Sequence, residues 1–226
     1  LSPSALVLEI TEGAVLGNQD AAQARMQQLQ SSGYRIASLS CSGGEASLVA
    51  DLSEATNLVF APFPDEQRAR IESTLTELVS VGNPFDYHTF MWGDKEAMTR
   101  TFSETMRGEH DATILLLDAP PRPDQDASSW VVAAEAFAAA SNDTKRRGII
   151  VATISECFSE SMRNSITALG MTPAQGLRET LVALDRCAWL GQHAPQNAPA
   201  NVSAPGNTVI VDEARAKERL GTWNIA

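Results

Sequence analysis

Two short runs in which nearly every residue is apolar, 112–117 (ATILLL) and 148–153 (GIIVAT), constrain the fold most strongly. Successive side chains of a strand point to opposite sides of a sheet, so a continuous apolar run predicts a strand that is buried on both faces. Strands of this kind are typical of parallel sheets that are covered by helices. The chain is therefore expected to alternate strands with helices.

The remaining segments continue this alternation. Further strands are predicted at 35–40 and 58–61, and helices at 43–52, 64–78, 94–106, 128–140, 159–169 and 173–190, the last broken near Gly176. The pattern predicts an α/β fold with an open, parallel, flavodoxin-like sheet and helices on both faces. Ligands of such sheets bind beyond the carboxyl ends of the strands, which directs attention to 40–45, 118–120 and 153–156.

Composition limits the size of the core and the class of partner. With 226 residues, of which 43% are hydrophobic, the chain can bury one substantial core, so we expect one main domain with appendages. The formal net charge of −11 argues against nucleic acid and anionic membranes as partners, because both favour clustered Lys and Arg. No apolar run approaches the roughly 20 residues that span a bilayer.

The three cysteines, Cys41, Cys157 and Cys187, are widely spaced and form no C-x-x-C pair. Their odd number and spacing argue against a disulfide framework and against a zinc site, and they favour a reducing cytoplasm. No H-x-x-x-H pattern or carboxylate cluster suggests a metal site of another kind. We therefore assign no metal ligands.

Both ends of the chain are interpreted as parts of other structural units. Residues 1–34 are expected to be the remnant of a preceding domain or an N-terminal arm, and 35–191 the flavodoxin-like domain. A linker rich in Pro, Asn and Ala is predicted at 192–207, and the pattern at 208–226 indicates the first helix of a further domain. The chain is thus expected to work as part of a larger protein.

The main candidate for a binding site is the segment that joins the first predicted strand to the helix after it, Ser42, Gly43, Gly44 and Glu45. Free N–H groups and the helix dipole at such a helix start can hold an anion of phosphate size. A tight turn without a ligand is the alternative, because neither a G-x-G-x-x-G nor a Walker spacing is present. Glu45 suits a helix start, yet it would repel an anion if it faced the same site, so its direction is decisive.

Three residues of the loop after the helix predicted at 64–78 are candidate ligand contacts or loop-stabilising residues. Asn83 and Asp86 bracket Pro84, and side chains of this kind readily bind backbone amides in turns. His88 follows close behind and could contact a ligand or remain a surface residue. These alternatives stay open on the sequence alone.

Three blocks of the chain occur in a fixed order: 35–51 (RIASLSCSGGEASLVAD), 81–87 (VGNPFDY) and 91–94 (MWGD). In order and spacing they resemble the NDP-forming (ADP-forming) acyl-CoA synthetases, which are relatives of succinyl-CoA synthetase. The terminal segments 213–217 (EARAK) and 223–225 (WNI) look like the first helix of the ATP-grasp domain that follows in many members of that family. The resemblance covers most of the chain after residue 34.

The resemblance implies a succinyl-CoA synthetase-like ligase that converts a carboxylic acid, CoA and ATP into acyl-CoA, ADP and phosphate. In that scheme the phosphoryl group moves between an acyl phosphate, a histidine and a nucleoside diphosphate. The domain seen here would stabilise the phosphohistidine through a helix N-terminus, which by position would be Ser42, Gly43, Gly44 and Glu45. The resemblance leaves the catalytic residues themselves unidentified.

The same resemblance implies which cofactors and partners to expect. CoA and ATP with Mg would serve the complete enzyme, and none of them would bind tightly to this chain alone. The partners would be the CoA-binding, phosphohistidine and ATP-grasp domains or subunits of one cytoplasmic ligase, with a homo-oligomer also open. The isolated chain is expected to be inactive.

One block departs from the family pattern. Members carry the phosphorylated histidine in a loop resembling S-H-T-G, and the nearest likeness here is 9–18 (EITEGAVLGN), with Ile10 at the histidine position. Isoleucine cannot be phosphorylated. Two alternatives follow: a non-catalytic flavodoxin-like interaction module that has lost the histidine, and a domain that binds a phosphorylated ligand.

Overall fold

The described part of the chain comprises residues 33–76, 79–122 and 124–193, in a computed structural model. The chain divides into two compact units, Leu1–Gly191 and Gln192–Ala226. Residues 1–32 of the segment predicted at 1–34 lie outside the described residues, and with them Ile10. Residues 194–207 of the predicted linker and the helix predicted at 208–226 also lie outside them.

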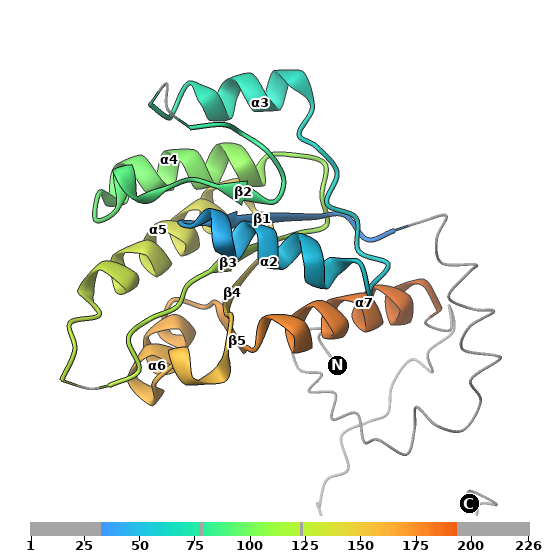
Figure 1. The fold of residues 1–226 in the computed structure, drawn as a ribbon. Coiled ribbons are helices and arrows are strands. Elements are labelled where there is room, and N and C mark those ends of the chain that lie inside the picture. The colour runs from blue at the N-terminus through green and yellow to red at the C-terminus, as the bar shows by residue number, and fades with distance from the viewer. Residues whose placement is uncertain (1–32, 77–78, 123, 194–226) are drawn as a thin grey trace, which may run out of the picture. The chain divides into compact units, whose positions relative to one another are not determined.

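A parallel sheet forms the centre of the described region (Figure 1). Its order is β2-β1-β3-β4-β5, which is the flavodoxin-like order. The strands are β1 (Ile36–Ser40), β2 (Phe85–Asp86), β3 (Ala112–Leu116), β4 (Gly148–Ala152) and β5 (Thr172–Gln175). All four pairings are parallel, so the predicted α/β flavodoxin-like fold is confirmed.

Helices connect the strands and cover both faces of the sheet (Figure 1). They are α2 (Gly43–Ser53), α3 (Asp65–Glu72), α4 (Lys95–Met106), α5 (Ser128–Thr144), α6 (Glu160–Ala168) and α7 (Leu177–His193), with short 3-10 turns η3 (Thr89–Met91) and η4 (Ser155–Cys157). Side chains of α2 and α7 fill the core on one face. Side chains of α3, α4, α5 and α6 fill the core on the other.

The alternating side chains of β3 explain its continuous apolar run. Ile114 and Leu116 join the core beneath α2 and α7, whereas Leu115 and Leu117 join the core beneath α4 and α5. All four side chains are at most 1% exposed. Both faces of this central strand are therefore buried, as the sequence pattern predicts.

The predicted strand at 58–61 is wrong as an element of the sheet. Val59 forms an isolated parallel bridge with Arg35, and its carbonyl accepts a hydrogen bond of 2.9 Å from the Ile36 amide. The position beside β1 is taken instead by β2, which the sequence analysis did not predict. With two residues, β2 is too short to produce a periodic pattern.

The helix predicted at 173–190 begins later than expected. Residues 172–175 form the edge strand β5, and Gly176 (φ 87°) turns the chain into α7. Because Thr172 to Gln175 offer no apolar run, pairing with β4 decides this strand. Similarly, the helix predicted at 64–78 ends at Glu72, and Leu78 lies outside the described residues.

Candidate functional site

The candidate site lies at the carboxyl edge of the sheet, where β1 and β3 are neighbours but their connections leave in opposite directions. From β1 the chain crosses to β2 on one side, and from β3 it crosses to β4 on the other. Helices that diverge in this way leave a crevice at the strand ends, where doubly wound sheets bind ligands. The segments that follow β1, β2, β3 and β4 supply its residues.

The start of α2 carries backbone N–H groups without an acceptor. Ser42 is the extended N-cap residue (φ −145°, ψ 132°), and its side chain makes no cap hydrogen bond. The first helical bond joins the Ala46 amide to the Ser42 carbonyl at 3.1 Å. Within the described residues the amides of Gly43, Gly44 and Glu45 have no partner, and both glycines are exposed. This is the arrangement that holds anions at helix starts.

Glu45 turns inward from this helix start. Its Oε2 lies 4.0 Å from Cys41 Sγ, and burial raises the pKa of its carboxyl from 4.5 to about 7, with the charges of Asp118 and Asp86 adding to the effect. A backbone hydrogen bond from Cys41 opposes the rise. Near neutral pH this carboxyl is therefore divided between its neutral and charged forms.

Cys41 is not an activated nucleophile. Burial and the neighbouring Glu45 carboxylate raise the pKa of its thiol to about 11, so the thiol form dominates at neutral pH. The side chain packs at the border of the core beneath α4 and α5. Its chemistry is that of a small apolar residue.

Asp86 and His88 stand next to the α2 start. A Cβ atom placed on Gly43 would lie 3.4 Å from Asp86 Oδ2, so the carboxylate lies against the first residue of the helix. Asp86 Oδ1 accepts the His88 amide at 2.8 Å, and Oδ2 lies 3.7 Å from His88 Nδ1. The His88 side chain is 43% exposed and that of Asp86 is 18% exposed. The structure thus brings these two predicted contacts to the edge that carries α2.

Asn83, the third residue of that group, lies elsewhere and has backbone partners. Its Nδ2 donates to the Ile36 carbonyl at 2.8 Å and to the Ala61 carbonyl at 3.0 Å, while its Oδ1 accepts the Ser38 amide at 3.1 Å. These bonds connect β1 to the irregular segment 58–61 beside it. Both N–H groups of the Asn83 side chain are used in these bonds. Of the two roles considered from the sequence, Asn83 therefore has the loop-stabilising one.

Asp118 and Thr153 form the far side of the crevice. Asp118 Oδ1 accepts the Thr153 amide at 2.7 Å, and Oδ2 accepts its hydroxyl. This pair links the ends of β3 and β4. The sequence rule located both segments, but the pairing itself depends on strand order and could not be read from the sequence.

A buried tyrosine beside the site has an unpaired hydroxyl. Tyr87 is 0% exposed, its ring packs edge-on against Phe102 at 5.1 Å, and its hydroxyl has no hydrogen-bond partner within the described residues. Burial, with added effects of Cys41, Glu45 and Asp86, raises its pKa well above the ordinary value. The sequence does not point to Tyr87, because no pattern marks a buried phenol hydroxyl without a partner.

We expect Tyr87→Phe to raise the free energy of unfolding by about 1 kcal/mol, because it removes a buried polar group that has no partner. Denaturant unfolding of both proteins measures the change. Thr113→Val is the matched control, since the buried Thr113 hydroxyl has a partner, His110 Nε2, at 2.8 Å. The control should lose stability; a similar loss in Tyr87→Phe would show that its hydroxyl has a partner.

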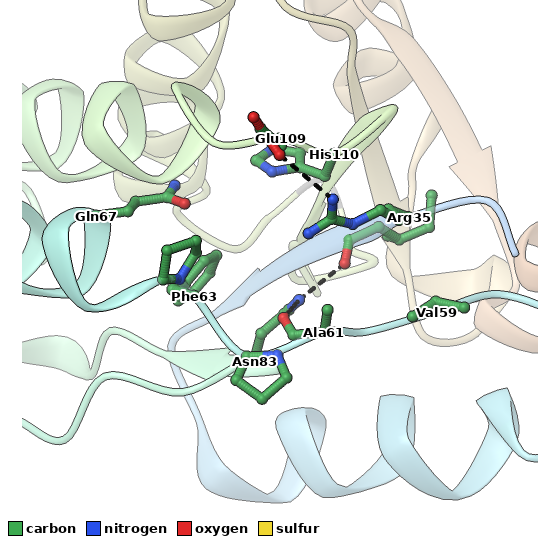
Figure 2. Close-up of a pocket in the computed structure, with 11 residues that line it drawn as sticks. Arg35, Val59, Ala61, Phe63, Gln67, Asn83, Glu109 and His110 are labelled. Atoms are coloured by element: carbon green, nitrogen blue, oxygen red, sulfur yellow. Dashed lines mark hydrogen bonds and ion pairs between the residues drawn. The ribbon is translucent and has the colours of Figure 1, made fainter.

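A separate cavity opens at the opposite, amino edge of the sheet (Figure 2). Arg35, Asn83, Glu109 and His110 line it, and Arg35 forms an ion pair of 3.7 Å with Glu109. Its volume of about 10 Å³ has room for about one water molecule, far less than a nucleotide needs. Burial lowers the pKa of His110 to about 4, aided by Arg146 and Arg35, so its ring is neutral here.

The described region shows neither a cluster of metal ligands nor a membrane-spanning helix. Within residues 33–76, 79–122 and 124–193, no group of three or more His, Cys, Asp or Glu side chains could hold a metal ion. None of the helices described there is long and apolar enough to cross a membrane.

Known structures share the fold of this chain. The protein PH0766 of Pyrococcus horikoshii superposes with a TM-score of 0.54 at 18% identity, over 67% of this chain and 34% of that protein. The dinucleotide-forming acetyl-coenzyme A synthetase 1 of Ca. Korarchaeum cryptofilum, without ligands, superposes with a TM-score of 0.50 at 13% identity. That match covers 73% of this chain and 36% of the synthetase.

The Korarchaeum synthetase has also been solved in complex with phosphate and ADP. This chain spans about a third of the length of these two proteins. No protein-family model matches it, and no curated protein matches it in sequence. At these identities the similarity establishes the fold alone.

Proposed function

We propose that this chain is the flavodoxin-like CoA-ligase domain of an NDP-forming acyl-CoA synthetase, and that the start of α2 stabilises a phosphohistidine. The observation that carries the proposal is the turn at the crevice between β1 and β3, where the amides of Gly43, Gly44 and Glu45 have no partner among the described residues. These three amides and the positive end of an 11-residue helix favour a phosphoryl group there. The sequence resemblance and the shared fold support the same assignment.

In this proposal the α2 turn acts by electrostatic stabilisation. A phosphoryl group on a histidine of another domain enters the crevice, and the amides donate hydrogen bonds to its oxygens. The complete cytoplasmic ligase uses CoA, a carboxylic acid and ATP with Mg, and releases acyl-CoA, ADP and phosphate. Its CoA-binding, phosphohistidine and ATP-grasp domains supply the other sites, as the coverage of about a third of the matched proteins suggests.

The inward direction of Glu45 makes this site compatible with an anion. Its carboxyl faces Cys41 rather than the open side of the turn, and with a pKa of about 7 a large part of it is neutral at physiological pH. Asp86, which lies against Gly43, and Asp118, whose charge also reaches Glu45, add negative charge near the turn. Affinity for an anion should therefore fall as pH rises above 7 and Glu45 ionises.

A non-catalytic interaction module is the second candidate, and Ile10 favours it. Isoleucine stands where the family pattern has its phosphorylated histidine. In that case the α2 turn would still accept a phosphorylated ligand or a phosphorylated partner, without ligase chemistry in this chain.

A negative charge introduced at one exposed position, Gly44, tests the α2 site. Gly44 has room for a side chain, since an added Cβ would meet only Ser42 Oγ at 3.5 Å. Gly44→Asp places a carboxylate at the second helical residue, where it stabilises the helix but repels an anion. We expect sulfate, which keeps its charge between pH 6 and 8, to bind on the order of tenfold more weakly to this variant.

Calorimetric titration with sulfate measures the effect. Ser161→Asp is the matched control, because it adds the same charge at the second residue of α6 and this position is also exposed. The control should bind sulfate like the wild type. Equal affinities for wild type and Gly44→Asp would refute the anion site at α2.

A further inference from the structure

An apolar groove lies between the edge strand β5 and helix α7, on the face of the sheet whose core is filled by α2 and α7. Its volume is about 310 Å³. The apolar side chains that line it are half-buried or exposed: Ile149, Ala174, Ala183, Leu184 and Cys187. Leu190, which is 38% exposed, continues this side of α7. Parallel sheets are normally covered on both faces, so a further element is expected beside α7.

The polar side chains of the groove are partly engaged within the chain. The Thr180 hydroxyl donates to the Gly176 carbonyl at 2.7 Å, and Gln175 Nε2 donates to the Ser155 carbonyl at 2.9 Å. Sites for small molecules combine apolar walls with polar groups that orient the ligand. Since these two polar groups already have partners, the groove suits the apolar side chains of a protein segment better than a polar metabolite.

The outer edge of β5 does not favour an added strand. The Gly176 amide donates to the Ala152 carbonyl of β4 at 3.1 Å. Because backbone groups alternate in direction along a strand, the backbone of Pro173 and Gln175 faces the outer edge. Proline has no N–H to offer a new strand. A helix packed into the groove is therefore the better occupant, as on the faces of other α/β sheets.

The segment 1–32 joins the described region close to this groove. Burial raises the pKa of Tyr34, the neighbouring Asp111 and Cys187 add to the effect, and Arg147 opposes it through its charge and a hydrogen bond. Tyr34 therefore lies near Cys187, which lines the groove. The start of β1 and the end of α7 lie at the same side of the sheet (Figure 1). A segment that ends at residue 32 can reach the groove from there.

The sequence before Gly33 has the pattern of an amphipathic helix. Residues 20–31 (DAAQARMQQLQS) consist mainly of Ala, Gln, Arg, Met and Leu, which favour helices. Ala22, Met26 and Leu29 are spaced by four and three residues, so they share one side of such a helix. Gln27, two residues before Leu29, lies on the opposite side. The segment thus offers one apolar side to the groove and a polar side to solvent.

We propose that residues 20–31 form a helix that fills the groove between β5 and α7, with Met26 and Leu29 packed against it. This helix completes the layer on the α7 face of the sheet. The flavodoxin-like domain then begins near residue 20, and 20–31 is not the remnant of a preceding domain. Cys187 lies beneath the helix and is shielded from solvent.

Methyl contacts test the packing directly. The full chain is labelled with ¹³C at the methyl groups of Met, Leu and Ala. We expect nuclear Overhauser effects between the Met26 methyl group and the methyl groups of Ala183 or Leu184. Effects that connect Met26 only with residues of 20–31, or with another part of the chain, would overturn the proposal.

The reactivity of Cys187 provides a second measurement. Alkylation of the full chain by iodoacetamide is followed by mass spectrometry of the peptide that contains Cys187. Leu29→Asp should raise the alkylation rate of Cys187 on the order of tenfold, because a carboxylate replaces a buried leucine side chain and the helix leaves the groove. Gln27→Asp is the matched control, since it adds the same charge on the opposite side of the helix. Its rate should equal that of the wild type.

Other occupants of the groove give different results. Equal rates in the wild type, Leu29→Asp and Gln27→Asp would overturn the proposal. A rate that falls as protein concentration rises would assign the groove to a second copy of the chain. A rise in Trp223→Asp without one in Leu29→Asp would assign it to residues 208–226. None of these measurements involves phosphate or ligase activity, so the proposed function is tested separately.

Discussion

Asn83→Ala is expected to lower the free energy of unfolding by about 3 kcal/mol or more. The side chain makes three hydrogen bonds to the backbone of Ile36, Ser38 and Ala61, at 2.8 to 3.1 Å. Alanine would leave these groups without partners beside the first strand, and an unsatisfied buried backbone group costs about 1–3 kcal/mol. Urea-induced unfolding of the two proteins measures the loss.

Asn57→Ala is the matched control for this result. Its side chain donates one hydrogen bond, to Asp185 Oδ1 at 3.1 Å, so a loss of about 1 kcal/mol is expected. A loss in Asn83→Ala no greater than in the control would contradict the role of Asn83 in holding β1. Sulfate binding should be unchanged in Asn83→Ala molecules that remain folded, because Asn83 lies outside the α2 site.

Glu45→Gln is expected to raise the free energy of unfolding at pH 8 by about 1–3 kcal/mol. In the folded protein the pKa of Glu45 is about 7, against an ordinary value of 4.5. The folded state therefore holds a proton that the unfolded chain releases between these two values. Stability is fully present below pH 4.5 and is lost as pH rises through 7, and glutamine removes this loss.

Unfolding curves at pH 5 and pH 8 check the sign. At pH 5 the folded carboxyl is largely neutral, so the gain from Glu45→Gln should nearly vanish. Asp51→Asn removes a carboxylate from the same helix at an exposed position and should show no comparable gain. A Glu45→Gln gain of equal size at both pH values would contradict the burial of this carboxyl.

The parts of the fold that follow from local pattern were predictable. The apolar runs 112–117 and 148–153 predict strands that are buried on both faces, and the structure has them in the sheet interior as β3 and β4. Gly43 and Gly44 after a strand predict a helix start, which α2 confirms.

The parts that depend on long-range pairing were not predictable. β2 has two residues and β5 is polar, so each is a strand only because a neighbour pairs with it. The segment 58–61 has a strand-like composition, yet it is left with one bridge because β2 takes the place beside β1. Propensity is outweighed by tertiary context at these positions.

In the candidate site, too, some features follow from local sequence and others depend on long-range contacts. The position of Ser42 to Glu45 beyond a strand end follows from the chain order alone. The inward turn of Glu45 and the unpaired hydroxyl of Tyr87 depend on packing between segments far apart in sequence. So does the strained backbone of His88 (φ 59°), which the sequence does not reveal because residues with side chains only rarely adopt positive φ.

Release of ADP by the intact native protein that carries this chain tests the central claim most directly. The wild type should release ADP from ATP with Mg over many turnovers only when CoA and a carboxylic acid are both present. Gly44→Asp should slow this release on the order of tenfold or more, whereas Ser161→Asp should leave it unchanged. Equal rates for the wild type and a folded Gly44→Asp protein would contradict a phosphoryl-stabilising role of the α2 turn.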